Sequence, residues 1–324
     1  MKNSIKTIAL SLFVATSLLF TSCSSDDKNP VTVDNTITGI ASKTPDFSIL
    51  VQALVKADLA TTLQGSDNYT VFAPTNAAFT AFLATTPYTT IDQVPTAALK
   101  EILLNHVLVG TSKSTDLTTT YVKTLAKGSA SATNNLSMFV NTAGGTVKLN
   151  GVATVTTADV LASNGVIHIV DKVIDLPTIV THATANPNFT SLVGALTGEG
   201  QPDFVSILSG TGPFTVFAPT NAAFTAFNTE LAPGGIASVS TANLTSTLQY
   251  HVVSPANVLS STLTEGQIVT PILTPSQTFR IQLTGGAKIL DASNRLSNIV
   301  VADVQCSNGV IHAIDKVLLP VFPM

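Results

Sequence analysis

One pattern of apolar and polar positions occurs twice along the chain. Residues 70–82 read TVFAPTNAAFTAF, and residues 215–227 repeat those letters without a change. Each copy opens with alternating Val-Phe positions that end at a proline, and in the first copy Phe79 and Phe82 then lie three apart. Alternation is typical of a strand, and a spacing of three places side chains on one face of a helix. Each copy therefore predicts a strand that runs into a helix.

The residue after each proline is expected to start that helix. Thr75 and Thr220 occupy this position. A threonine hydroxyl accepts hydrogen bonds from the N–H groups of a first helical turn, and proline disfavours helix in the residue before it. Thr75 and Thr220 are therefore predicted N-caps.

Two further helices are expected in the first copy. Residues 47–63 carry apolar positions in a helical rhythm and are followed by Gly65, a common stop signal. A second helix, capped by Thr96 or a neighbour, is predicted to end near His106.

The remainder of the first copy is predicted to be strand-rich. Residues 147–155 are interrupted by Asn150-Gly151, and residues 155–174 by Asn164-Gly165. Asn-Gly between apolar runs is a strong signal for a β-hairpin. Helices first and hairpins afterwards predict an α+β fold with a largely antiparallel sheet.

The copies are separated by 141 to 145 residues throughout. Solenoid and propeller repeats have periods of roughly 20 to 50 residues, so this spacing indicates tandem domains. We expect domain 1 over residues 37–176 and domain 2 over residues 177–324.

Three motifs in a fixed order resemble the fasciclin (FAS1) domain. They are the 13-residue motif above, a histidine at a helix end (His106, His251), and Asn-Gly-Val-Ile-His at residues 164–168 and 308–312. The resemblance implies two β-wedges or sandwiches with helices clustered at one edge. It also implies a secreted or surface-anchored protein linked to cell adhesion and matrix contact.

The chain departs from the family's pattern at two places. Where family members often have Asp-Glu after the threonine, it has Asn76-Ala77 and Asn221-Ala222, which removes charge from the helix start. The tyrosine of the family's Tyr-His pair remains as Tyr250, and Asn105 replaces it in domain 1.

The histidines are predicted to be structural. His168 and Asp171, like His312 and Asp315, lie three apart, and on a strand such positions face opposite sides. A shared metal or acid–base site within one strand is therefore excluded. The imidazoles are expected to bond backbone, and the aspartates to close a turn or pair with a lysine.

Other polar candidates are also assigned structural roles. His106 and His251 are expected to bond the last carbonyls of their helices, with partner binding as the alternative. His182 is placed in the linker between the domains, and Cys306 is expected to be a buried, inert thiol. The sequence contains no Gly-x-Ser-x-Gly, phosphate-binding loop or paired-histidine zinc helix. We therefore predict no catalytic residue, cofactor or metal.

The first residues are predicted to direct export. Lys2 and Lys6 precede an apolar run of about 13 residues, which is too short to span a bilayer, and the run ends before Cys23. This arrangement resembles a bacterial lipoprotein signal. We expect a signal peptide over residues 1–22, lipidation of Cys23, a flexible tether over residues 23–36, and a location at the outer membrane, with surface exposure as a further possibility.

Composition narrows the function. Without residues 1–22 the chain has 13 basic and 19 acidic residues, which disfavours nucleic acid as a partner. The leading hypothesis is a lipid-anchored adhesion protein that binds a protein or matrix partner. The alternatives are a glycan-binding lipoprotein, disfavoured because the chain has no Trp and four Tyr, and a hydrolase. Binding is expected on loops that differ between the copies, at residues 110–131 and 254–275.

Overall fold

A computed structural model describes residues 34–322. The predicted signal peptide, Cys23 and most of the tether lie outside this range. The tether is predicted to extend to residue 36, but Thr36 is already part of the fold. It is the N-cap of α1 (Ile37–Lys43), and its side chain accepts a hydrogen bond from the backbone N–H of Gly39.

The helices of domain 1 precede and interrupt its strands. They are α1, η1 (Pro45–Phe47), α2 (Ser48–Lys56), α3 (Ala60–Gln64), α4 (Asn76–Leu83), η2 (Ile91–Gln93) and α5 (Thr96–Leu104). The prediction of a single helix over residues 47–63 is wrong, because Asp58 adopts a φ of 56° and separates α2 from α3. The predicted cap Thr96 is the first residue of α5 instead, and no side chain caps that helix.

Domain 1 contains one seven-stranded sheet in the order β2-β1-β7-β6-β5-β4-β3. Its strands are β1 (Tyr69–Pro74), β2 (Val107–Val109), β3 (Thr120–Gly128), β4 (Ser131–Asn141), β5 (Lys148–Leu149), β6 (Ala153–Ala162) and β7 (Gly165–Val170). Both predicted Asn-Gly hairpins are confirmed. All pairs are antiparallel except β1 with β7, which run parallel.

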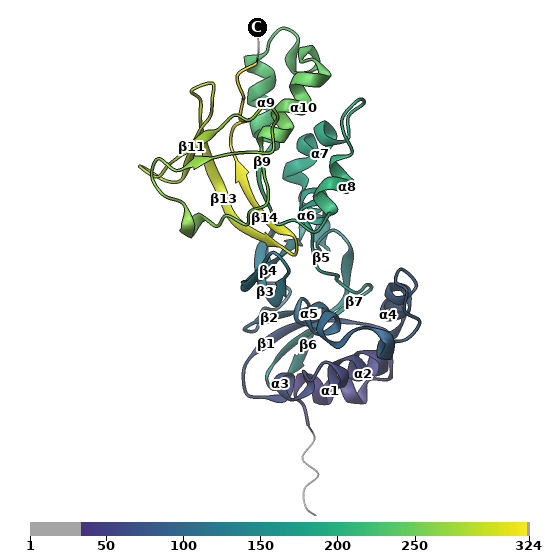
Figure 1. Ribbon diagram of the computed structural model, residues 1–324. Helices are drawn as coiled ribbons and strands as arrows, with labels where there is room; N and C mark the ends of the chain where they lie inside the picture. The colour runs from purple at the N-terminus through teal and green to yellow at the C-terminus, as the bar shows by residue number, and fades with distance from the viewer. Residues whose placement is uncertain (1–33, 323–324) are drawn as a thin grey trace, which may run out of the picture. The chain divides into compact units, whose positions relative to one another are not determined.

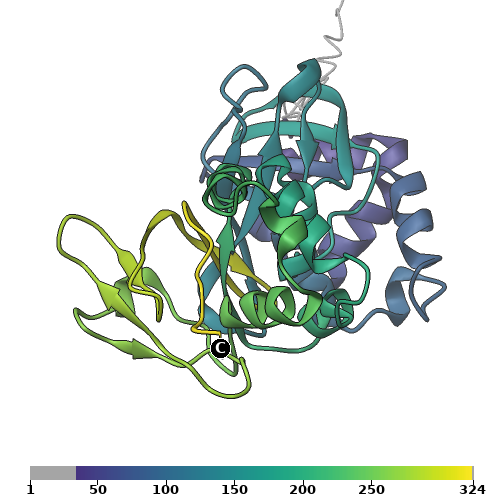
Figure 2. The ribbon, with the colours of Figure 1, turned by 90° about the horizontal axis from the view of Figure 1, so that it is seen from above.

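Domain 2 repeats the arrangement, with the sheet order β10-β11-β12-β13-β14-β8-β9 and β8 parallel to β14. Its helices are α6 (Ile179–Ala185), η4 (Pro187–Phe189), α7 (Thr190–Leu196), α8 (Phe204–Ser209), α9 (Asn221–Glu230), η5 (Gly235–Ser238), α10 (Thr241–Tyr250) and η6 (Ser260–Thr262). Its strands are β8 (Phe214–Pro219), β9 (Val252–Val253), β10 (Ile268–Val269), β11 (Phe279–Gln282), β12 (Lys288–Leu290), β13 (Leu296–Cys306) and β14 (Gly309–Ile314). Within this domain the green helices gather at one side of the sheet, and the yellow-green ribbon of residues 268–290 lies at the other (Figure 1, Figure 2).

The strand of the repeated motif is buried on both faces. In β1, Val71 and Ala73 join the core beneath the helices, whereas Phe72 joins a second core on the other face with Val140 and Leu149. The predicted strand is confirmed, but every residue of it is buried, so its apolar residues form a continuous run and not the expected alternating pattern. The expected α+β fold with helices at one edge of the sheet is confirmed.

The predicted N-caps are also confirmed. The hydroxyls of Thr75 and Thr220 accept hydrogen bonds from Ala78 N and Ala223 N, at 3.2 and 3.3 Å. The next residue, Asn76, holds the preceding helix in place: its Oδ1 accepts from Ile49 N at 2.9 Å, and its Nδ2 donates to Pro45 O at 3.0 Å. Asn221 makes the equivalent bonds to Ser191 N and Pro187 O.

A buried asparagine joins the helices to the hairpin in each domain. Asn164 Oδ1 accepts from Ile37 N at 2.8 Å, and its Nδ2 donates to the carbonyl oxygens of Leu63 and Gly65 at 2.8 and 2.9 Å. Asn308 makes the same three kinds of bond in domain 2. One amide thus satisfies three backbone groups that come from the start of one helix and the end of another.

Replacing Asn164 with alanine is expected to lower the free energy of unfolding of domain 1 by about 3 kcal/mol. The substitution leaves buried backbone groups without partners, each at a cost of roughly 1–3 kcal/mol. Urea denaturation of the variant measures the loss. Asn188→Ala, at an exposed position in domain 2, is the control and should change stability by less than about 0.5 kcal/mol. A loss for Asn164→Ala no larger than the control's would show that the amide is dispensable.

Candidate functional site

His106 and His251 are locked into one neutral tautomer. His106 Nδ1 donates to Ile102 O at 2.7 Å, and its Nε2 accepts from Ile174 N at 2.9 Å. His251 bonds Thr247 O and Leu318 N in the same way. Burial lowers the pKa of both imidazoles to about 4. Both ring nitrogens are occupied within the fold, so the predicted structural role is supported and the partner-binding alternative is not.

Two further histidines lie beside an aspartate and a serine that no sequence motif indicates. His168 is fully buried, and its Nδ1 accepts from Asp159 N at 3.3 Å, while its Nε2 donates to Ser112 O at 2.9 Å. The Asp159 carboxylate accepts from the hydroxyl and the N–H of Ser114. His312, Asp303 and Ser260 form the same arrangement in domain 2.

This trio contains the residue types of a hydrolase triad in a different order. In a nucleophilic triad the imidazole bonds the serine hydroxyl, and the carboxylate orients the imidazole. Here the carboxylate of Asp159 lies between the other two side chains, so the Ser114 hydroxyl donates to a carboxylate and not to the imidazole. Asp159 also has a φ of 62° at an irregularity in β6. The trio therefore serves to fasten the loop that contains Ser114 to the sheet.

The same contacts revise the expectation about binding loops. Residues 110–131 and 254–275 differ in sequence, but an Asp–Ser hydrogen bond holds both segments, and the first contains the whole of strand β3. Asp171 and Asp315 follow the ends of their strands and accept from Thr154 N and Asn298 N. Neither aspartate bonds the histidine of its own motif.

The prediction that His182 lies in a linker is wrong. It is a fully buried residue of α6, and its ring meets Tyr121 edge-on, with centroids 5.3 Å apart. Burial lowers its pKa to about 3. The helix is the counterpart of α1, so the domain begins before this histidine.

Cys306 lies in the core of domain 2, in agreement with its expected inert role. It is fully buried, and burial raises the pKa of its thiol. The backbone N–H of the neighbouring Gln305 donates to Ser137 Oγ of domain 1 at 3.0 Å.

Tyr250, the remaining tyrosine of the family's pair, is also fully buried. Its hydroxyl donates to Thr278 O at 2.8 Å, and burial raises the pKa of this hydroxyl to about 12.

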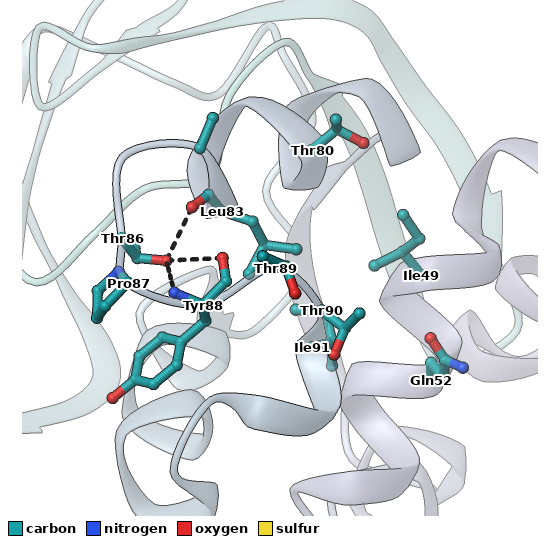
Figure 3. Close-up of a pocket in the computed structure, with 11 residues that line it drawn as sticks. Ile49, Gln52, Thr80, Leu83, Thr86, Pro87, Tyr88, Thr89, Thr90 and Ile91 are labelled. Carbon is teal, nitrogen blue, oxygen red and sulfur yellow. Dashed lines mark hydrogen bonds between the residues drawn. The ribbon is translucent and has the colours of Figure 1, made fainter.

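Domain 1 has an open pocket of about 560 Å³, here called the neutral pocket. Figure 3 shows Ile49 and Gln52 of α2 on one side and the segment after α4 on the other. The lining residues are Ile49, Gln52, Thr80, Leu83, Ala84, Thr86, Pro87, Tyr88, Thr89, Thr90 and Ile91. None of them is charged. No motif in the sequence points to this site, although the segment at residues 84–91 differs between the two copies.

Internal hydrogen bonds fix the shape of that segment. The Thr86 hydroxyl donates to Leu83 O at 2.9 Å and accepts from Tyr88 N at 3.2 Å (Figure 3). Thr89 donates to Gln93 Oε1, and Thr80 to Asn76 O. The amide of Gln52 and the hydroxyl of Thr90 are exposed and form no side-chain hydrogen bond within residues 34–322.

Domain 2 has a pocket at the corresponding place with different chemistry. It measures about 440 Å³ and lies between α7, α9 and η5. Ser191 and Gly194 stand where domain 1 has Ile49 and Gln52, and Glu199 adds a carboxylate to the lining. The two domains share a fold but present different surfaces at this site.

Within residues 34–322 the structure contains no group of three or more His, Cys, Asp or Glu arranged to hold a metal ion. In the same range, none of the helices combines the length and apolar character needed to cross a membrane.

The chain is a tandem-domain protein. Each α+β domain has one parallel strand pair next to an edge strand of its sheet, and histidines bonded to backbone. Comparison with known families identifies the domain. The chain belongs to the fasciclin domain family, because the Fasciclin domain model matches residues 45–177 and again residues 187–320.

Several relatives are similar to one or both domains. Protein sll1483 of Synechocystis is 37% identical over 143 residues, which cover 44% of this chain and 73% of that protein. Immunogenic protein MPB70 of Mycobacterium bovis is 37% identical over 147 residues, 43% of this chain and 66% of its own. Human periostin is 29% identical over 197 residues, which cover 58% of this chain and 21% of periostin.

A solved structure supports the fold independently. The FAS1 domain pair of the insect cell adhesion molecule fasciclin I matches with a TM-score of 0.52 and 21% identity. The match covers 83% of this chain and 95% of that one. At this identity the likeness shows the fold, and it confirms the tandem arrangement of fasciclin domains.

Proposed function

We propose that this protein is a lipid-anchored adhesion protein of the cell envelope, held at the outer membrane through Cys23 and binding protein or matrix partners with its tandem domains. The observation that carries the proposal is the pair of complete fasciclin domains, since the solved pair with the same fold belongs to a cell adhesion molecule. The bonding of the histidines supports a binding function rather than catalysis, because every imidazole named in the family motifs bonds backbone.

Replacing Cys23 with serine is expected to release the protein from the membrane fraction. Stable anchoring depends on acyl chains, and a serine cannot carry the thioether-linked lipid. Fractionation of cells followed by immunoblotting measures the distribution. Cys306→Ser is the matched control. The folded protein of this variant should remain in the membrane fraction. Retention of the Cys23→Ser variant would contradict the anchor.

Adhesion itself is tested in cells that lack the gene. We expect reduced attachment to matrix or to neighbouring cells, restored by the wild-type gene and not by the Cys23→Ser gene. Attachment that is unchanged by deletion would overturn the proposed function.

A further inference from the structure

The neutral pocket of domain 1 has the size of a ligand site. Its volume of about 560 Å³ falls within the range of roughly 300–1,000 Å³ found for sites that hold small molecules or short segments of chain. All of its lining side chains are uncharged. The nearby Lys56 ammonium already donates to the carbonyl oxygens of Ile91 and Asp92. A charged group pressed against the apolar floor would therefore lose hydration without meeting a lining side chain of opposite charge, so the chemistry of the pocket favours a neutral occupant.

The floor of the neutral pocket is apolar and its rim is polar. Leu83 and Ile91 are buried, and Ile49 is half-buried beside them. The Gln52 amide on the rim can both donate and accept hydrogen bonds. A peptide group has the same pair of functions, and an aliphatic side chain next to it matches the floor.

A neutral sugar would share the lack of charge but fits less well. Sugar recognition commonly uses an aromatic face, and Tyr88 is the aromatic residue that lines the pocket. Figure 3 shows its ring directed away from Ile49 and Gln52. The observations therefore favour a polypeptide.

We propose that the neutral pocket binds an uncharged segment of a partner protein, with an aliphatic side chain against Ile49 and Leu83 and the backbone of that segment on the Gln52 amide. The inference rests on the proposed adhesive function and gives the chemistry of its partner. The corresponding pocket of domain 2 does not share this specificity. Gly194 replaces Gln52, the amide of Gln201 is hydrogen-bonded within the fold, and Glu199 adds a carboxylate.

The test is a titration of the full chain in detergent, with isotope-labelled Ile and Leu methyl groups observed by NMR. The probes are capped tripeptides of Ala-Leu-Ala, with Ala-Lys-Ala and Ala-Asp-Ala as charged counterparts and maltose as a neutral sugar. We expect saturable shifts of the Ile49 and Leu83 methyls with the leucine peptide and a Kd of about 1 mM, as suits a shallow site. The charged peptides should bind at least tenfold more weakly.

Matched variants assign the binding to one pocket. Gln52→Glu should weaken binding of the leucine peptide at least tenfold, whereas Gly194→Glu, at the equivalent open position of domain 2, should not change it. Both positions are exposed on helices, and unchanged methyl signals elsewhere in each variant verify the fold.

Four results would overturn the proposal. They are no shift with the leucine peptide, equal binding of charged peptides, shifts with maltose alone, and full binding by Gln52→Glu. Because the titration uses purified protein, its failure leaves the attachment experiment standing. Lost peptide binding and lost attachment are therefore separate outcomes.

Discussion

Replacing Gly165 with alanine is expected to unfold domain 1. A Cβ built on this glycine lies 1.9 Å from Tyr69 O, and the residue has a φ of +145°. The clashing atoms belong to the backbone of the parallel partner strand β1, so a side-chain rotation cannot relieve the clash. We expect a loss of more than about 4 kcal/mol, a large part of the roughly 5–15 kcal/mol that stabilises a domain. Circular dichroism and urea denaturation of the variant measure it.

Gly144→Ala is the control that separates the steric clash at Gly165 from the strain of a positive φ. Gly144 also has a positive φ, +79°, but a Cβ added there would meet nothing within 4 Å. Its cost should be about 1 kcal/mol, the usual penalty of a left-handed conformation. Equal losses for the two variants would show that the contact with Tyr69 O is unimportant.

The second large effect is a loss of stability in mild acid. An unfolded histidine takes up a proton near pH 6.5, whereas folded His106 and His251 have a pKa of about 4. The unfolded chain therefore binds more protons between these values, and stability falls as the pH is lowered from about 6.5 to about 4. At pH 5 each imidazole is expected to contribute a loss of about 2 kcal/mol relative to pH 7.

Urea denaturation at a series of pH values measures this loss. His106→Asn should be less stable at pH 7, because two backbone groups lose their partner, but its domain should show a flatter pH dependence. The carboxylates whose pKa is lowered by hydrogen bonds, such as Asp159, contribute below about pH 4. His182 of domain 2, with a pKa of about 3, adds to the loss in the same range as His106 and His251, and the His106→Asn substitution removes the contribution of His106 alone. A pH profile unchanged by the substitution would mean that His106 is protonated equally in both states.

The parts of the fold that follow from local sequence are predictable. The threonine caps, the Asn-Gly hairpins and the duplication depend on residues adjacent in the chain. The break between α2 and α3 is not predictable. The helical spacing of apolar residues continues across Asp58, although its backbone adopts a left-handed φ of 56°. The parallel pairing of β1 with β7 is not predictable either, since nothing in either strand specifies the direction of a partner so distant in sequence.

The candidate site is less predictable than the fold. Asn76 reads in the sequence as a lost charge, yet its amide ties the helices together through three hydrogen bonds. Asp159 and Ser114 have no visible signal, because they meet only after the loop folds back on the sheet. The neutral pocket is formed by a helix and a segment about 35 residues apart, and only their packing makes the cavity.

The parallel pairing of β1 with β7 has a consequence for synthesis. When β1 leaves the ribosome, its parallel partner β7 has yet to be translated, because about 90 residues separate the two strands. Contacts so distant in sequence form late and slowly. The sheet of domain 1 can be completed only when its last strand, β7, has emerged, and this happens before β8 of domain 2 is made. Because the domains are made one after the other, β1 and β8, which differ only at their first residue, can each pair with the right partner in turn.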